Sequence, residues 1–206
     1  STISRNTLEL NLSGGLLKLA GDLELAGTIT DNTTKLTLQA DSTLGNTVAT
    51  KFGALDLNAS ALSITMATTI NDPLTLDAAG EQLLTGTSAL TLNDILTLSA
   101  GKLSSQSGLI SFASSVSLGE AGTIDIQGGT LQLSGNMSVS GGTLTIADTT
   151  ELNLNNDVSI SSNRALSIGT LEMNNRSLTF TATENADLTL KKAFSLNNGS
   201  TLQMNG

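Results

Sequence analysis

Four residue types are missing from this chain of 206 residues, which contains no cysteine, histidine, tryptophan or tyrosine. Without cysteine and histidine, the chain lacks the ordinary ligands of zinc, haem and iron–sulfur sites. It also lacks a Ser-His-Asp triad and a cysteine nucleophile. The glycine-rich phosphate-binding patterns GxxxxGK(S/T) and GxGxxG are absent as well. We therefore expect no metal, no cofactor and no nucleophilic catalytic site of these kinds.

Positive charge and long apolar runs are also scarce. Lys and Arg number 9 against 18 Asp and Glu, which gives a formal net charge of -9. Nucleic acids and anionic membranes attract clustered Lys and Arg, so we expect no nucleic-acid partner. No apolar run approaches the roughly 18 residues that a membrane helix needs, so we expect no membrane insertion.

What the chain does contain is a short alternating pattern. Between Val116 and Ile160, an apolar-polar-apolar triplet recurs about every six to eight residues, as in Val116-Ser117-Leu118. Alternation places the two apolar residues on one face of a β-strand and the middle residue on the other. The connections are rich in Gly, Asn, Asp and Ser, which tolerate turns. The pattern therefore predicts short strands separated by tight corners.

Every third triplet aligns, which reveals a repeat of about 20 residues. In this alignment Leu17 is followed 19 residues later by Leu36, and later steps lengthen to at most 24 residues. A second column begins at Leu23 and continues with Leu44 and Leu62, and a third begins at Ile29 and continues with Val48, Ile70 and Leu90. Apolar residues that recur at one position of every repeat are expected to stack inside the fold. The predicted core ladder consists of Leu36, Leu38, Leu55, Leu57, Leu74, Leu76, Leu96, Leu98, Val116, Leu118, Met137, Val139, Val158, Ile160, Leu178 and Phe180.

Three short strands per repeat and no helical period predict an all-β, single-domain parallel β-helix, or β-solenoid, over residues 1–206. We expect about ten turns of about 20 residues, each strand pairing with its equivalent one turn later at about 4.8 Å. We expect a right-handed helix, which is the usual hand of parallel crossovers. A membrane barrel would need strands of about ten residues and aromatic girdles, which the chain lacks.

Asparagine gathers at the corners that precede the first column. The two physical explanations are a stacked ladder of side-chain amides and the tolerance of Asn for left-handed backbone conformations. Both remain open for the four turn candidates Asn136, Asn156, Asn175 and Asn198.

The outward positions give little sign of catalysis. A polysaccharide-cleaving site needs several acids converging on one face, but among the middle residues of the first column only Asp56 is acidic. No predicted face stacks two acids on adjacent turns, so we do not expect an enzyme. Outward Thr75 and Thr97 raise ice binding as a further alternative, but the column offers one hydroxyl per strand, and Ser117 and Ser138 interrupt the threonines.

The repeat, for example LTLQADSTLGNTVATKFGA from Leu36 and MSVSGGTLTIADTTELNLNND from Met137, resembles the β-helical shafts of bacterial secreted exoproteins. Filamentous-haemagglutinin-like proteins and autotransporter passengers are similar in period and composition. This resemblance implies export, an extracellular or bacterial cell-surface location, and a role as a stalk, adhesin or fibre. It transfers no site residues.

These observations favour a structural rod of an extracellular bacterial surface protein, fibre or filament. The alternative is an adhesin module that binds a glycan or a cell surface, and a polysaccharide-active enzyme or an ice-binding protein ranks below it. Uncapped solenoid ends expose strand edges and apolar side chains. We therefore expect the chain to be a segment of a longer rod or a filament protomer whose partner is itself, stacked end to end.

Overall fold

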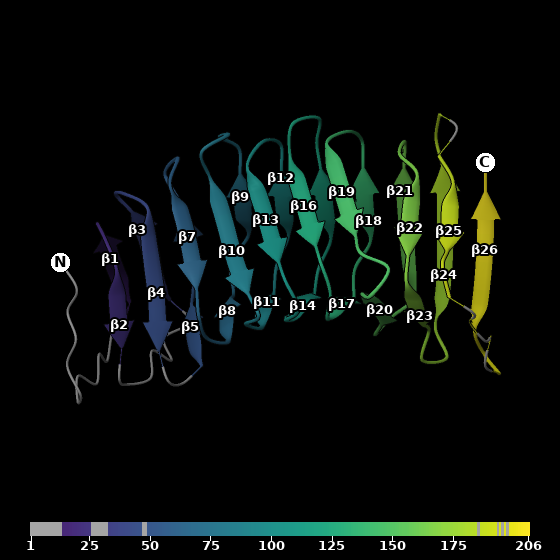
Figure 1. The fold of residues 1–206 in the computed structure, drawn as a ribbon, viewed down its shortest axis with the longest axis horizontal. Coiled ribbons are helices and arrows are strands. Elements are labelled where there is room, and N and C mark those ends of the chain that lie inside the picture. The colour runs from purple at the N-terminus through teal and green to yellow at the C-terminus, as the bar shows by residue number, and fades with distance from the viewer. Residues whose placement is uncertain are drawn as a thin grey trace.

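The computed structural model describes residues 14–25, 33–46, 49–184, 186–192, 194, 196 and 198–206. These residues form a parallel β-solenoid of about eight turns, with about 21 residues per turn and no helix. Figure 1 shows the turns stacked along one long axis, with β1 (Gly15–Leu19) and β26 (Thr201–Asn205) at opposite ends. The predicted fold class is therefore confirmed. The positions expected to contribute to the earliest turns, including Ile29, lie partly outside the described residues.

Three seven-stranded parallel sheets form the sides of the rod. Sheet 1 contains β2 (Leu23–Leu25), β4 (Ser42–Asn46), β7 (Ala61–Ile64), β10 (Gln82–Gly86), β13 (Lys102–Ser105), β16 (Thr123–Ile126) and β19 (Thr143–Ile146). Sheet 2 contains β5 (Thr50–Phe52), β8 (Thr68–Ile70), β11 (Leu90–Leu92), β14 (Leu109–Phe112), β17 (Thr130–Leu133), β20 (Glu151–Leu154) and β23 (Thr170–Glu172). Sheet 3 contains β9 (Leu74–Leu76), β12 (Leu96–Leu98), β15 (Val116–Leu118), β18 (Met137–Val139), β21 (Val158–Ser162), β24 (Ser177–Ala182) and β26.

Two smaller sheets complete the ends. One joins β1, β3 (Thr34–Leu38) and β6 (Ala54–Asp56), and the other joins β22 (Leu166–Ile168) and β25 (Leu188–Leu190). Almost every strand has its pairing partner one turn away in the chain, so each turn is held mainly by its neighbours.

A single apolar core runs along the axis of the rod. Every residue of the predicted core ladder is buried, and the most exposed of them, Leu55, keeps 7% of its surface accessible. The middle residue of each triplet points outward, because successive side chains of a strand alternate between its faces. Phe52, Phe112 and Phe180 are the largest fully buried side chains.

The sequence alignment predicts that Leu55 in β6 pairs with Leu74 one turn later, but the sheet that contains β6 ends at this strand. In the structure, β6 and β9 belong to different sheets. The N–H of Leu74 donates to the carbonyl of Ile95 at 2.9 Å. Pro73 directly precedes β9, and proline has no N–H to donate to a ladder.

At three places the register differs from the sequence alignment by two residues. Met137 pairs with Ile160 instead of Val158, Leu44 pairs with Ile64 instead of Leu62, and Ile70 pairs with Leu92 instead of Leu90. Ile70 also pairs with Phe52 of β5, where the alignment used Val48, which lies outside the described residues. A shift of two residues keeps every side chain on its original face, whereas a shift of one would invert the strand. The apolar pattern is therefore compatible with both registers, and other contacts select between them.

Corner aspartates connect successive turns. Oδ1 of Asp41 accepts the backbone N–H of Ala61 at 2.8 Å, and Oδ1 of Asp157 accepts that of Ser177 at 2.8 Å. Asp22 holds the N–H of Thr43 in the same way. Each carboxylate belongs to one turn and each donor to the next, so the side chain supplies a backbone partner where a corner interrupts the ladder.

Candidate functional site

The four predicted turn asparagines have different roles in the structure. Nδ2 of Asn156 donates to the carbonyl of Ser134 at 2.9 Å, and Oδ1 of Asn136 accepts the N–H of Ser159 at 2.9 Å. Asn175 has a φ of 59° and Asn198 lies in an exposed turn. In the described part of the chain, none of the four bonds to another of the four. Asn136 and Asn156 thus bond across turns to the main chain, and Asn175 adopts the left-handed conformation.

Amide-to-amide contacts occur at other positions. Nδ2 of Asn93 donates to Oδ1 of Asn71, and Nδ2 of Asn174 donates to Oδ1 of Asn153, both at 2.6 Å. These two pairs were not predicted from the sequence. Asn71 and Asn93 each directly follow a strand of sheet 2. This shared position in successive repeats is the sequence feature that could have predicted their contact.

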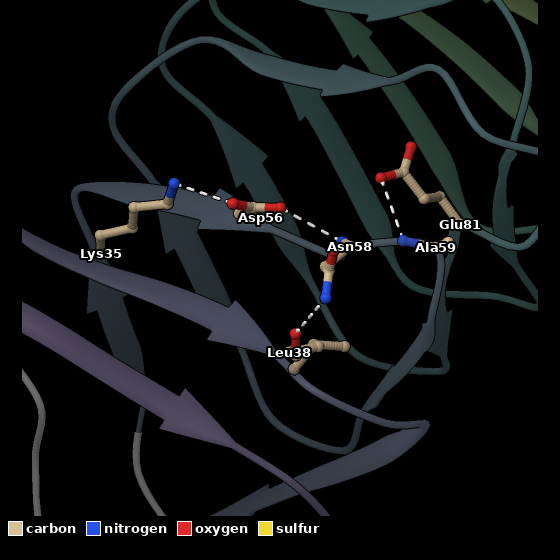
Figure 2. Close-up of polar contacts among 6 residues, drawn as sticks. All are labelled: Lys35, Leu38, Asp56, Asn58, Ala59 and Glu81. Atoms are coloured by element: carbon tan, nitrogen blue, oxygen red, sulfur yellow. Dashed lines mark hydrogen bonds and ion pairs between the residues drawn. The ribbon is translucent and has the colours of Figure 1, made fainter.

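A group of polar residues holds the corner after β6 (Figure 2). Nζ of Lys35 lies 2.8 Å from Oδ2 of Asp56, whose Oδ1 accepts the N–H of Asn58 at 3.2 Å. The amide of Asn58 donates to the carbonyl of Leu38 one turn back. Asn58 and Ala59 both have positive φ, at 48° and 60°. These contacts hold a conformation that is unfavourable for alanine.

Glu81 completes this corner from the following turn. Its side chain is buried, and Oε2 accepts the N–H groups of Asp77 and Ala78 at 2.7 and 3.0 Å. Oε1 accepts the N–H of Ala59 at 3.5 Å. Both carboxylate oxygens are therefore engaged by the main chain, which gives Glu81 a structural role.

Two further described acids form ion pairs with lysines. On sheet 1, Oδ2 of Asp125 lies 3.2 Å from Nζ of Lys102. The other pair is that of Asp56 with Lys35, on the small sheet of β1, β3 and β6. Within the described ranges, no group of three or more His, Cys, Asp or Glu residues is placed to hold a metal ion. The part of the chain that the structure describes also has no helix long and apolar enough to cross a membrane.

One outward row of sheet 3 carries hydroxyl side chains on six successive strands, from β9 to β24, and ends at Asn205 on β26. The register places the six side chains in a line, one turn apart. At β21 and β24 a second pair, Ser159 and Thr179, lies beside this line. The sequence alignment predicts one outward hydroxyl per strand and pairs Ser138 with Ser159. In the structure, Ser138 pairs with Ser161. We call the line the hydroxyl row; it comprises Thr75, Thr97, Ser117, Ser138, Ser161 and Thr181.

The hydroxyl row differs from the corresponding row of sheet 2. There, Oγ of Ser111 donates to Oε1 of Gln132 at 3.0 Å, and Nε2 of Gln132 donates to Oδ1 of Asn155 at 3.2 Å. Those side chains satisfy one another across turns. The hydroxyls of the hydroxyl row, by contrast, make no hydrogen bond with any residue that the structure describes, so they face solvent as free donors and acceptors.

A shallow trough interrupts the middle of the hydroxyl row. It lies over the serines, and threonines with an additional methyl group continue the row on both sides. Ile95 stands at its margin with 44% of its surface exposed. The trough is lined by Ile95, Ser115, Val116, Ser117, Asn136, Met137, Ser138, Ser159 and Ser161, none of which is charged.

The C-terminal turn presents a different surface. Met204 and Leu196 are 54% and 53% exposed, and Phe194 is 36% exposed. Met204 pairs with the fully buried Phe180, so it continues an inward ladder whose outer side is uncovered. Among the described strands, β26 pairs only with β24, and its other edge is open. We call Phe194, Leu196 and Met204, with the open edge of β26, the terminal apolar surface.

Comparison with known proteins returned no relative. No protein-family model matches the chain, and neither a curated protein nor a solved structure does. Functional inference therefore depends on the surfaces described above.

Proposed function

We propose that this chain is a structural β-solenoid rod of an extracellular bacterial surface protein or fibre, and that further solenoid turns pack end to end on its C-terminal turn. The observation that carries the assembly proposal is the terminal apolar surface. An open strand edge with unpaired N–H and C=O groups is a template for another strand. Met204 and Leu196 add apolar area that a following turn would remove from water. The bacterial surface location rests on the resemblance of the repeat to exported shafts.

The distribution of charge supports contacts at the ends over contacts at the sides. Residues 52–163 contain ten Asp or Glu residues and one Lys, so they carry the whole net charge of -9. The remaining residues contain eight acids and eight bases. Two rods side by side would bring like charges together, whereas ends are close to neutral. Added salt should weaken this lateral repulsion.

The core supports a role as a spacer. Turns stacked at about 4.8 Å make eight turns about 38 Å long. Their interior is apolar, and each turn depends mainly on its two neighbours. Such a rod can be extended by adding turns without altering the existing ones, which suits a stalk or a fibre.

The assembly proposal is tested by sedimentation velocity and electron microscopy of the 206-residue chain over a range of concentrations. In the isolated chain, a second copy must supply the packing turn, so we expect head-to-tail oligomers that grow with concentration. Met204→Glu should shift the chain to monomers, because it places a charge on the terminal apolar surface. Thr143→Glu, on the exposed side of β19, is the matched control and should assemble like the unaltered chain. A chain that stays monomeric at high concentration, or equal assembly of both variants, would refute the proposal.

A further inference from the structure

We propose that the trough in the hydroxyl row is a binding site for an uncharged glycan chain that lies along the rod axis. This inference concerns the side of the solenoid and does not depend on end-to-end assembly. The free hydroxyls, the absence of charge and the exposed Ile95 together indicate this class of ligand.

The hydroxyls are arranged for a ligand with a regular repeat. Ser117 pairs with Ser138, and Ser138 pairs with Ser161, so their side chains recur every turn, at about 4.8 Å. Each hydroxyl can donate one hydrogen bond and accept two. Sugar hydroxyls have the same capacity. Because no described residue uses the trough hydroxyls, a ligand would replace only water.

Asn136 adds a fixed amide to this surface. Its Oδ1 is held by the N–H of Ser159, which orients the side chain. Its Nδ2 donates to no residue in the described ranges, and the side chain lines the trough. An amide held by its oxygen offers its N–H groups to an acceptor such as a ring or hydroxyl oxygen of a sugar.

Ile95 supplies the apolar part of the site. It is one of the few large apolar side chains exposed on the described surface, and it adjoins Ser115 and Ser117 along the trough. The C–H face of a sugar ring is apolar, so contact with Ile95 would bury area on both partners. The chain has no tryptophan or tyrosine that could stack on a ring instead.

The absence of charged residues in the trough favours an uncharged ligand. No lining residue is charged, so a carboxylate or sulfate group would find no cationic partner in the trough. The trough also lies within residues 52–163, which carry the negative net charge. An anionic polysaccharide would be repelled, and an uncharged one would not.

Two features favour a glycan over ice. Ice binding requires a flat, regular face, whereas here small serines lie between threonines and form a depression. Ile95 also projects beside the row. A depression with an apolar margin suits a chain of rings better than a planar crystal surface.

The test measures binding of the 206-residue chain to soluble uncharged polysaccharides, namely dextran, galactomannan and β-1,3-glucan, beside anionic alginate and polygalacturonate. We expect retention by at least one uncharged polymer and by neither anionic one. Ser138→Asp should reduce that binding at least about tenfold, because a carboxylate at the centre would have to lose water without a partner. Ile95→Ser should reduce it several-fold. Thr143→Asp, an exposed strand position on sheet 1, should bind like the unaltered chain.

Thermal melts of the three variants establish that each is folded before binding is compared. Selective loss in Ser138→Asp and Ile95→Ser supports the site. Equal binding by Ser138→Asp and the unaltered chain would place the ligand elsewhere and overturn the proposal. Failure of the unaltered chain to bind any uncharged polymer would overturn it too, as would shaping of ice crystals without glycan binding.

Discussion

Oδ1 of Asn136 accepts the backbone N–H of Ser159 at 2.9 Å, across one turn of the solenoid. Beside this bond, the pairing of β18 with β21 starts at Met137 and Ile160 instead of Met137 and Val158. The side chain thus takes a backbone donor at the beginning of β21 and allows the strand to extend two residues beyond its neighbour. A corner side chain and a strand register are therefore linked.

Removing this acceptor should destabilise the middle turns. Asn136→Ala leaves the Ser159 N–H without its protein partner, and we expect a loss of about 1 kcal/mol in the free energy of unfolding. Asn136→Asp retains an oxygen at the same position and should remain close to the unaltered chain. Urea denaturation of the two variants provides the measurement. Equal losses in both would show that the hydrogen bond does not stabilise this corner.

The inward and outward positions of β15 should respond very differently to the same substitution. Leu118 is fully buried between Leu98 and Val139, whereas the neighbouring Ser117 is exposed. Leu118→Asp would bury a carboxylate without a partner, so we expect a loss of several kcal/mol or failure to fold. Ser117→Asp should change stability by no more than about 0.5 kcal/mol. Similar urea midpoints for the two variants would contradict the assignment of faces.

Glu81 should stabilise the corner after β6 through its carboxylate oxygens. Glu81→Ala leaves the N–H groups of Asp77 and Ala78 without their acceptor, and hydrogen bonds to charged groups contribute about 1.5–3 kcal/mol each. Since these two bonds share one oxygen and are not additive, we expect a total loss of about 2–3 kcal/mol. Glu81→Gln retains one acceptor and should lose less. Thermal unfolding compares them, and a Gln variant as unstable as the Ala variant would argue against this role.

Two glycines allow backbone strain to be separated from crowding. Gly129 and Gly86 both have positive φ, at 75° and 56°. A Cβ on Gly129 would lie 2.2 Å from the carbonyl oxygen of Ser107, whereas one on Gly86 would meet nothing within 4 Å. Gly86→Ala should cost about 1–2 kcal/mol, from the left-handed conformation alone. Gly129→Ala should cost clearly more, because two turns must also move apart, and chemical denaturation would show the difference. Equal costs would mean that the turns are not packed this closely.

Much of the fold follows from the sequence because one physical rule applies to every strand. A period of two places the first and third residues of each triplet on one face, as at Val116 and Leu118, and burial of that face needs no long-range information. Recurrence at about 20 residues then determines that the strands stack in parallel turns. The absence of histidine and cysteine likewise decides which metal and nucleophile chemistries are unavailable.

Tertiary structure decided the remaining features. The apolar pattern could not distinguish pairing of Met137 with Val158 from pairing with Ile160, because a two-residue shift preserves the faces. The sequence also aligned Leu55 with Leu74, whereas β6 and β9 belong to different sheets. The trough required knowing that the hydroxyls of Ser117 and Ser138 are free while that of Ser111 is bonded to Gln132. Sequence shows only that these residues are polar, and their hydrogen bonds are set by the side chains that the neighbouring turns place beside them.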